Sequence, residues 1–389
     1  MNNKFFITIL LSFIFLACGG NDEPKDNNDN DKNKPSQPDE TTTNGIDQFT
    51  NENIFSINNY LLSSNAIQTF DLDSNGRIWF LQNGTKHNEL NLVYSKRNLN
   101  KTPLTTNSEW MKLLYFGHGT NAAVEEDGDE RYLWLGAYAS CNKSGQYWSE
   151  KVIARVKYQK GITVKTNECN DYFYIVEYHD MHPAIDADND ILTINYADDS
   201  NSNYRCFRMF RLSDAKKASK RIVNIKVTDG FETGNIASTN IITVPVYCHD
   251  LTTLKPIADV KFLKTGYGST SANGKAPIYY DWQGFDVYKD RLYYVDGQSN
   301  YNLNKNFDSD VSHAYVTVFN FQSKIVKPRT AVAIISNREK LKEIGVTVFC
   351  ALEAEGVKVK GDKIYLGYTA QGIDANSSTY YQNIFYFNK

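Results

Sequence analysis

One phrase returns five times in this chain: an apolar strand, a tight turn of Asp, Asn and Gly, and a second strand rich in aromatic residues. The copies are residues 70–80, 124–135, 185–194, 285–295 and 357–366. Asn, Asp and Gly tolerate the positive φ that a tight turn requires, so each copy predicts a β-hairpin. A fold is therefore needed in which one hairpin can be repeated at irregular spacing.

Repeated hairpins of this kind indicate a β-propeller, in which each four-stranded blade packs on the next and the ring hides its edges. We expect an all-β chain with five blades, and six blades as the second choice. The long gap between the third and fourth copies leaves room for an extra blade or an insertion. A pair of β-sandwiches is the structural alternative. A helical pattern is limited to residues 337–344 and, more weakly, 214–219.

The N-terminus has the pattern of a lipoprotein signal peptide. The cationic start at Lys4 is followed by about 13 apolar residues, which is typical of a secretory signal and too short to span a bilayer. Ala17 supplies the small residue that a lipoprotein signal peptidase needs before Cys18. We expect residues 1–17 to be the signal peptide, 18–50 a lipidated cysteine with an acidic linker, and 51–389 the propeller. An ordinary secretory signal is the alternative.

The segment after Cys18 contains almost no apolar residue until about Gly45. Such a segment cannot bury enough surface to offset chain entropy, so we expect it to be disordered. Its acidic stretch from Asn21 to Asp26 resembles the export signal of surface-exposed lipoproteins in Bacteroides-type bacteria, although a solvated spacer would look the same. We expect a lipid-anchored protein of the outer membrane that faces the cell exterior.

Charge and cysteine usage exclude several functions. The chain has 42 Lys and Arg against 45 Asp and Glu, which does not favour nucleic acid as a partner. The cysteines after Cys18 lie far apart, without the paired spacing of zinc or redox sites. Buried free thiols are favoured over a disulfide such as Cys141–Cys169. We expect a monomer without a cofactor, attached to the membrane only by its lipid.

In a propeller, the first strand of each blade lines the central channel. Polar residues precede this strand in the predicted blades. This column would gather at one mouth of the ring, where converging polar groups can bind a ligand. Polar, water-filled channels without a ligand would show the same pattern. The predicted ligand-binding residues are Gln68, His118, Thr120, Asn121, His182, Trp282, Gln283, Glu353 and Glu355.

His118 is the best catalytic candidate because Gly117 and Gly119 flank it just before a strand. A histidine there could act as a base or a sugar ligand, or simply bond a backbone carbonyl. We predict no metal site. His179 and His182, three apart on a strand, would face opposite sides. The acidic turns lack the spacing of a calcium loop and are better explained as hairpin turns.

Several short motifs carry a resemblance to a known family. They are Phe116–Asn121, Val124–Asp127, Tyr132–Gly136, Lys151–Lys157, Gln283–Val287, Glu353–Val357, Lys363–Gly367 and Asn383–Phe385. Together they resemble the propellers of the teichoic-acid biosynthesis protein C type, of phage receptor-binding proteins and of the bacteriocin helveticin J, over most of residues 60–389. The resemblance implies five blades and, for the phage members, recognition of wall teichoic acid.

Three functions are compatible with these features. The first is a non-catalytic lipoprotein that binds a surface or dietary glycan or a cell-envelope glycopolymer, with Trp282, Tyr279 and Tyr280 stacking on sugars beneath a loop at 266–274. The second is a polysaccharide hydrolase or lyase, disfavoured because the predicted mouth holds no evident arginine and its two glutamates would repel an acidic substrate. The third is a helveticin-like toxin, which rests on resemblance alone. We expect a binding protein rather than an enzyme.

Overall fold

A computed structural model describes the part of the chain that follows the predicted tether. The chain divides into residues 1–36 and residues 37–389, and all described residues belong to the second unit. The predicted signal peptide, Cys18 and the predicted acidic linker all lie outside them. The described residues are 55–56, 65–84, 89–98, 109–142, 147–176, 178–198, 200, 203–235, 237–263, 281–299, 312–332, 335, 338–343, 346, 350–371 and 380–389.

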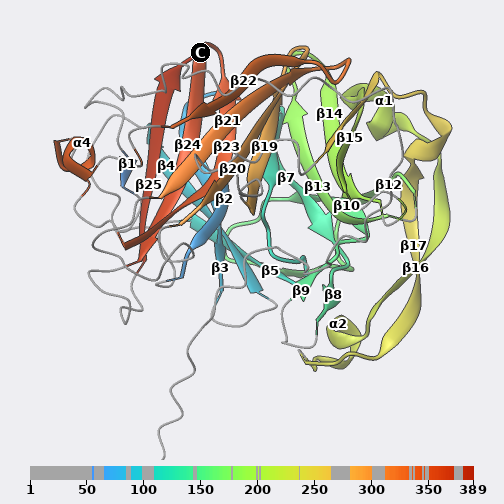
Figure 1. The fold of residues 1–389 in the computed structure, drawn as a ribbon. Helices are drawn as coiled ribbons and strands as arrows, with labels where there is room; N and C mark the ends of the chain where they lie inside the picture. The colour runs from blue at the N-terminus through green and yellow to red at the C-terminus, as the bar shows by residue number, and fades with distance from the viewer. Residues whose placement is uncertain are drawn as a thin grey trace, which may run out of the picture. The chain divides into compact units, whose positions relative to one another are not determined.

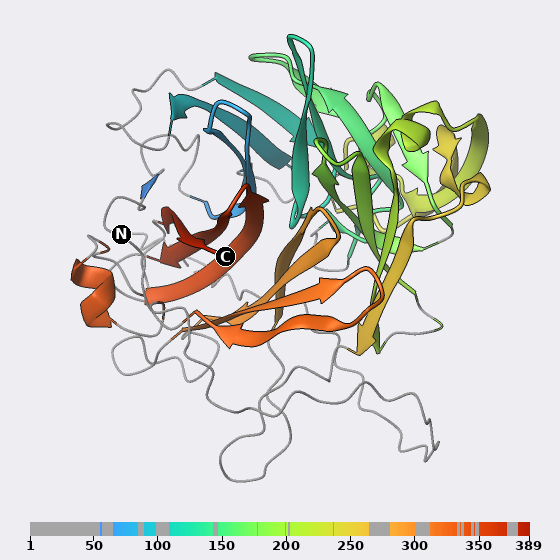
Figure 2. The same cartoon turned by 90° about the horizontal axis from the view of Figure 1, so that it is seen from above.

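Five antiparallel blades follow one another around a ring (Figure 2). Blade 1 contains β2 (Ile67–Leu72), β3 (Arg77–Asn83), β4 (Glu89–Asn98) and β5 (Glu109–Leu114). Blade 2 contains β6 (Ala122–Asp127), β7 (Glu130–Ala137), β10 (Val152–Lys157) and β12 (Asp171–Tyr174). Blade 3 contains β13 (His179–Asp186), β14 (Ile191–Ala197), β15 (Tyr204–Arg211) and β18 (Ala258–Leu263). Blade 4 contains β19 (Asp281–Tyr288), β20 (Arg291–Gln298), β21 (His313–Asn320) and β22 (Ile325–Ala331). Blade 5 contains β23 (Cys350–Lys360), β24 (Lys363–Gln371), β25 (Tyr380–Asn388) and β1 (Phe55–Ser56).

The start and the end of the propeller sequence both contribute strands to blade 5, and this closes the ring. The innermost strands contact one another in the cyclic order β2, β6, β13, β19 and β23, and β23 contacts β2 again. The short strand β1, which precedes blade 1 in sequence, pairs antiparallel with β25 of blade 5, with Phe55 opposite Ile384. The predicted five-bladed propeller is confirmed. Each copy of the repeated phrase is the inner hairpin of one blade.

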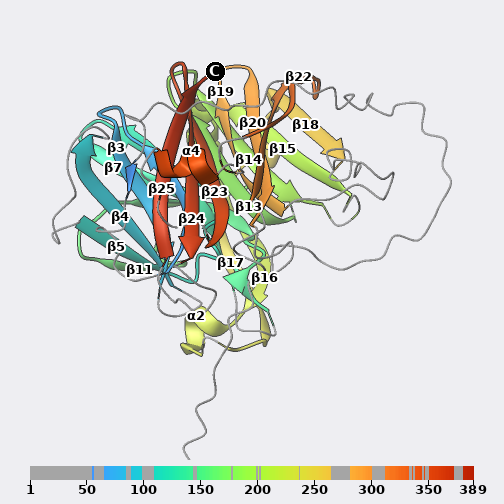
Figure 3. The ribbon, with the colours of Figure 1, turned by 60° about the vertical axis from the view of Figure 1, so that its left-hand side comes forward.

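The long gap between the third and fourth copies holds an insertion rather than a blade. Between β15 and β18 the chain forms α1 (Leu212–Lys217), β16 (Lys220–Thr228), α2 (Gly230–Thr233), β17 (Ile241–Asp250) and the turn η4 (Leu251–Thr253). Strand β17 pairs in parallel with β12, so blade 3 extends the outer edge of blade 2 (Figures 1 and 3). In the same way β11 (Thr163–Lys165) leaves blade 2 and pairs with β5 of blade 1.

The remaining elements are short. A two-stranded ribbon joins β8 (Ser140–Cys141) to β9 (Tyr147–Trp148), and α4 is Arg338–Glu343. Both predicted helical stretches are therefore helical, as α4 and α1. Among the described residues, no helix is long and apolar enough to span a membrane.

Buried polar bonds join neighbouring blades at the inner strands. In three blades the acid of the repeated phrase accepts a backbone N–H from the first hairpin of the next blade. The bonds are Val124 N to Asp71 Oδ2 at 2.8 Å, Lys289 N to Asp186 Oδ2 at 2.7 Å and Val359 N to Asp286 Oδ2 at 2.7 Å. Blade 5 has Lys358 at the matching position, and its Nζ donates to Ala122 O at 2.7 Å. The phrase therefore encodes contacts between blades as well as hairpins.

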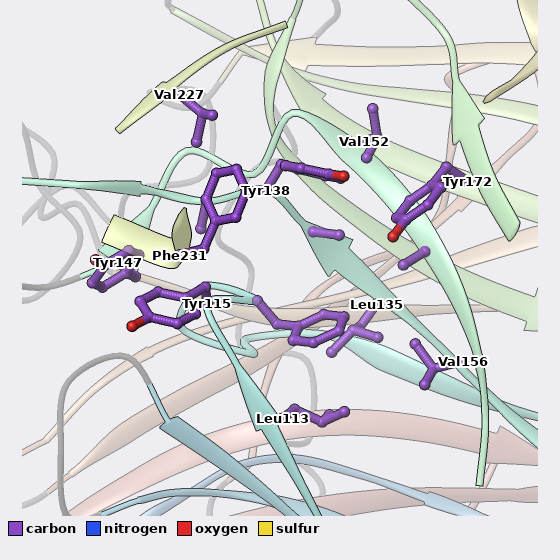
Figure 4. Packing of buried hydrophobic residues seen from close by; sticks show 14 of the residues in the cluster. Leu113, Tyr115, Leu135, Tyr138, Tyr147, Val152, Val156, Tyr172, Val227 and Phe231 are labelled. Atoms are coloured by element: carbon purple, nitrogen blue, oxygen red, sulfur yellow. The ribbon is translucent and has the colours of Figure 1, made fainter. Parts of the chain in front are cut away.

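Apolar side chains fill the spaces between the blades. The largest cluster joins blades 1 and 2 to the insertion, where Tyr138 packs edge-on against Phe231 of α2 (Figure 4). Cys141, Cys206 and Cys248 are buried and Cys169 is partly buried, and all four are free thiols. The expectation of free thiols is confirmed for these four, while the side chain of Cys350 lies outside the described residues.

Candidate functional site

The candidate site lies at the end of the ring where the inner strands begin, which we call the mouth. Ring contacts, hydrogen bonds and electrostatic interactions connect its residues across blades 2 to 5. The mouth is defined here by His118, Trp148, Glu150, His179, Asp180, His182, Arg205, Trp282, Gln283, Glu353, Glu355 and Tyr380.

The glycine-flanked histidine turns over a buried carboxyl group. Gly117 has a φ of +100°, and a Cβ there would lie 1.9 Å from Glu150 Oε1, so only glycine fits. The backbone N–H of His118 donates to the same oxygen at 3.3 Å. The imidazole of His118 stacks on Trp148 with centroids 4.0 Å apart. Gly117 therefore allows the backbone to approach Glu150 closely.

Glu150 is the most unusual ionisable group of blade 2. Its side chain is 1% exposed, and its Oε2 has no hydrogen-bond partner among the described residues. Burial, reinforced by the nearby charge of Asp180, raises the pKa of Glu150 to about 8. The carboxyl group is therefore mostly protonated at pH 7, which avoids an unpaired buried charge.

Asp180 has the opposite electrostatic setting. Burial raises its pKa, but a hydrogen bond from His179 and electrostatic interactions with His179, His182 and Arg205 outweigh it and lower the pKa to about 2. His179 Nδ1 lies 3.0 Å from Asp180 Oδ2. The strand is irregular between His179 and His182, so the simple alternation that placed these histidines on opposite sides does not apply.

An arginine, an indole and an imidazole meet between blades 3 and 4. The ring of His182 lies 5.0 Å from that of Trp282, and the guanidinium carbon of Arg205 lies 5.0 Å from the same indole. His182 is 5% exposed, and burial lowers its pKa to about 4, which keeps it neutral. The expectation that the mouth lacks an arginine is wrong. Arg205 is the second residue of the third strand of its blade, so it does not belong to the polar positions that precede the first strands.

The opposite end of the mouth is acidic. Gln283 Nε2 donates to Glu353 Oε1 at 3.0 Å, which links blade 4 to blade 5. Burial and the neighbouring Glu353 raise the pKa of Glu355 well above its usual value. Burial and the two glutamates raise the pKa of Tyr380 to about 12. Tyr380 and Glu150 had not been singled out from the sequence, because neither belongs to a first strand.

Three of the predicted ligand residues do not belong to this connected set. Asn121 is fully buried, donates to Pro183 O at 2.7 Å and accepts from Phe285 N at 3.3 Å, so it joins three blades. Gln68 is buried and donates to Ile67 O at 3.1 Å. Thr120 is partly buried. The other six are brought together at the mouth, and His118 is connected to the others by way of Glu150.

Two further expectations concern metals and loops. Within the described ranges, no group of three His, Cys, Asp or Glu side chains could hold a metal ion. The acidic turn at Asp73 accepts backbone N–H groups from Asn75 at 3.0 Å and Arg77 at 2.9 Å, as a hairpin turn does. The loop 266–274 and the aromatic residues Tyr279 and Tyr280 lie outside the described residues.

Solved structures similar to this chain include an α-L-arabinofuranosidase from Lactobacillus brevis, with a TM-score of 0.43, 9% identity, and coverage of 86% of this chain and 94% of that one. A subtype N11 neuraminidase-like protein from a flat-faced bat isolate has a TM-score of 0.33, 8% identity, and coverage of 91% and 93%. Polysaccharide lyase Uly1 has a TM-score of 0.33, 11% identity, and coverage of 84% and 92%. No curated protein sequence matches the chain.

A family model matches residues 65–235, which comprise blades 1 and 2, most of blade 3 and the start of the insertion. Its description is phage 5-bladed beta propeller receptor binding platform domain. The match covers less than half of the chain, and it confirms the part of the resemblance that concerns phage propellers. Over these residues the chain is similar to the receptor-binding propellers of phages.

Proposed function

We propose that this protein is a lipid-anchored receptor-binding propeller that recognises a glycan or cell-envelope glycopolymer at its mouth. The observation that carries the proposal is the connected set of ionisable and aromatic side chains that four blades bring to one end of the ring. Burying charged and polar groups costs free energy unless they are paired, and such groups concentrate at functional sites.

The types of side chain suit a sugar. Trp148, partly exposed beside His118, offers a ring face for stacking, and Glu353, Gln283 and Tyr380 offer hydrogen-bond groups for hydroxyls. The family that matches residues 65–235 is named for receptor binding in phages, which supports a recognition role. A cell-surface or dietary glycan is the ligand class that we carry over, without a specific polymer.

Lipidation at Cys18 is the second part of the proposal. The apolar run that ends at Ala17, followed by an acidic segment free of apolar residues, supports a lipid anchor with a flexible spacer. The protein would then face the exterior of the outer membrane. A binding head needs no partner subunit in this arrangement, so we propose a monomer.

Catalysis is the second candidate function, favoured by one observation. Glu150 and Asp180 have pKa values shifted in opposite directions, to about 8 and about 2, as an acid and its partner often have. Glu150 is covered, however, and one of its oxygens already accepts the His118 N–H. A group held in this way stabilises a loop, so we place polysaccharide hydrolase or lyase activity behind binding. A helveticin-like toxin stays a prediction from resemblance.

A panel of polysaccharides tests the proposal. Binding of residues 51–389 is measured by calorimetry, while reducing ends and unsaturated products are followed in the same samples. Trp148→Ala should weaken binding at least tenfold, because it removes the stacking face beside His118. Tyr247→Ala is the matched control, since Tyr247 is 60% exposed on the insertion hairpin, away from the mouth.

The outcomes separate the functions. Binding that Trp148→Ala weakens and Tyr247→Ala leaves intact supports the proposal when no product appears. Product release that His118→Ala abolishes would replace the binding function with an enzymatic one. Failure of the wild-type domain to bind any member of the panel would refute glycan recognition.

A further inference from the structure

We propose that Arg205 and Trp282 form a subsite for an anionic oxygen group of the ligand, either the carboxylate of an acidic sugar or a phosphodiester. This inference rests on the proposed glycan recognition and deepens it by naming the charge of the ligand. It concerns the blade 3 and blade 4 side of the mouth, where β15 and β19 begin.

Two hydrogen-bond donors there have no acceptor among the described residues. They are the indole Nε1 of Trp282 and the Nε of Arg205, both covered within the mouth. A buried donor left without an acceptor costs roughly 1–3 kcal/mol, so a fold retains such a group at a cost. An oxygen of a ligand that accepted from both would remove that cost on binding.

The charges around these donors suit one negative charge. Arg205 carries the positive charge, and its interaction with Asp180 lowers the pKa of that carboxyl group. His182 stays neutral because burial lowers its pKa to about 4, so it adds a polar ring without a second positive charge. Asp180 offsets part of the charge of Arg205, and an anionic oxygen would accept from the two unpartnered N–H donors more strongly than a neutral oxygen would.

The geometry gives the ligand a route to the donors. Arg205 is only partly buried, lies over the face of Trp282 and hydrogen bonds Tyr294. A carboxylate or phosphate beside the indole could accept from Arg205 Nε and Trp282 Nε1 together, and the planar guanidinium suits such a group. The glutamates of blade 5 would then face the neutral, hydroxyl-bearing part of the sugar, since they would repel its anionic group.

The test uses three probes against the propeller domain at low salt. These are oligogalacturonate, its fully methyl-esterified form and a glycerol-phosphate polymer. The variants are Arg205→Gln, which removes the charge, and Trp282→Phe, which removes the N–H and keeps an aromatic ring. Arg208→Gln is the control, because Arg208 lies on the same strand and pairs with the exposed Asp259 at 2.7 Å. Circular dichroism and thermal unfolding confirm that each variant folds.

The expected result is that wild type binds oligogalacturonate, the phosphate polymer or both at least tenfold more tightly than the esterified form. Arg205→Gln should abolish that preference, Trp282→Phe should reduce it severalfold, and Arg208→Gln should leave it intact. The preferred probe tells a carboxylate site from a phosphodiester site. Equal affinity for the charged and esterified probes, equal losses in Arg205→Gln and Arg208→Gln, or no binding to either anion overturns the subsite. Binding of neutral polysaccharides in the panel would leave the proposed function standing in each case.

Discussion

Single residues at the mouth show how far a side chain can depart from its usual chemistry. The charge of Asp180 helps to raise the pKa of Glu150, and at pH 7 Glu150 is mostly protonated while Asp180 is ionised. The difference arises from partners: Asp180 has the His179 ring and nearby positive charge, whereas Glu150 has one backbone N–H and an unpartnered oxygen. Sequence alone does not reveal this, because Glu150 is one of many surface-type acids until the fold covers it.

The raised pKa of Glu150 predicts a pH-dependent stability. The unfolded chain has a pKa near 4.5 for this group and the folded chain about 8, so the stability it provides is full below 4.5 and lost as pH rises to 8. Relative to wild type, Glu150→Gln should therefore gain on the order of 4 kcal/mol of stability between pH 5 and pH 8.5. Urea unfolding at several pH values measures this difference, with the exposed Glu339→Gln as control.

If wild type and Glu150→Gln lost stability in parallel across that pH range, Glu150 would not be the group responsible. The variant keeps the size of the side chain, so it should preserve the backbone contact with His118. A change in glycan affinity without a change in stability would instead give Glu150 a direct role at the mouth.

At the scale of elements, the inner hairpin is the unit that the sequence displays most clearly. Five copies predict five hairpins, because alternating strands and turn residues act locally. The strand that pairs with the outer strand β12 of blade 2 could not be predicted in this way. It is made by β17, which lies more than 60 residues beyond β12 and inside the sequence of another blade. The exposed and buried residues alternate along β17, which indicates a strand but not its neighbour.

The acids of the inner hairpins should behave as links between blades. Asp286→Ala leaves Val359 N buried without its acceptor and Lys358 buried without its nearest negative charge, although Lys358 keeps its bond to Ala122 O. The free energy of unfolding should fall by about 1–3 kcal/mol in chemical denaturation. Asp290→Ala, in the exposed turn of the same hairpin, should stay within about 0.5 kcal/mol of wild type.

Equal effects of Asp286→Ala and Asp290→Ala would show that the bond between blades contributes little. Asp286→Asn refines the result, because its amide oxygen can still accept from Val359 N. A stability close to wild type in that variant would assign the loss to the hydrogen bond rather than to the charge near Lys358.

At the scale of the whole molecule, the sequence predicted the ring but only part of its mouth. Residues just before the first strands were identified because the propeller places them at one end. Arg205, Glu150 and Tyr380 reach the same place from other strands or loops, and their convergence depends on how blades pack. Asn121 was identified for the same reason as His182, yet its amide bonds two backbone groups and stabilises the ring centre.

The proposed anchor predicts that the protein leaves the membrane when Cys18 is replaced. Cys18→Ala should move the protein from the membrane fraction to the soluble fraction and remove labelling by a palmitate analogue. Cys169→Ala, which changes a partly buried free thiol of the propeller, should leave both unchanged. Fractionation with the labelled lipid measures this. Retention of Cys18→Ala in the membrane would show that something other than this lipid holds the protein there.

Strand β1, which completes blade 5, also determines where a mechanical load would enter the propeller. A ligand held at the mouth and a lipid held in the membrane would pull on the chain in opposite directions. Within the described residues, that tension would first meet β1, whose two residues pair with Ile384 and Asn383 of β25. The pairing of Phe55 and Ser56 with β25 would therefore be the first to break under load. If these two residues separated from β25, that strand would lose an edge partner, while β19, β23 and β25, which bear the mouth residues of blades 4 and 5, would remain paired with β20 and β24.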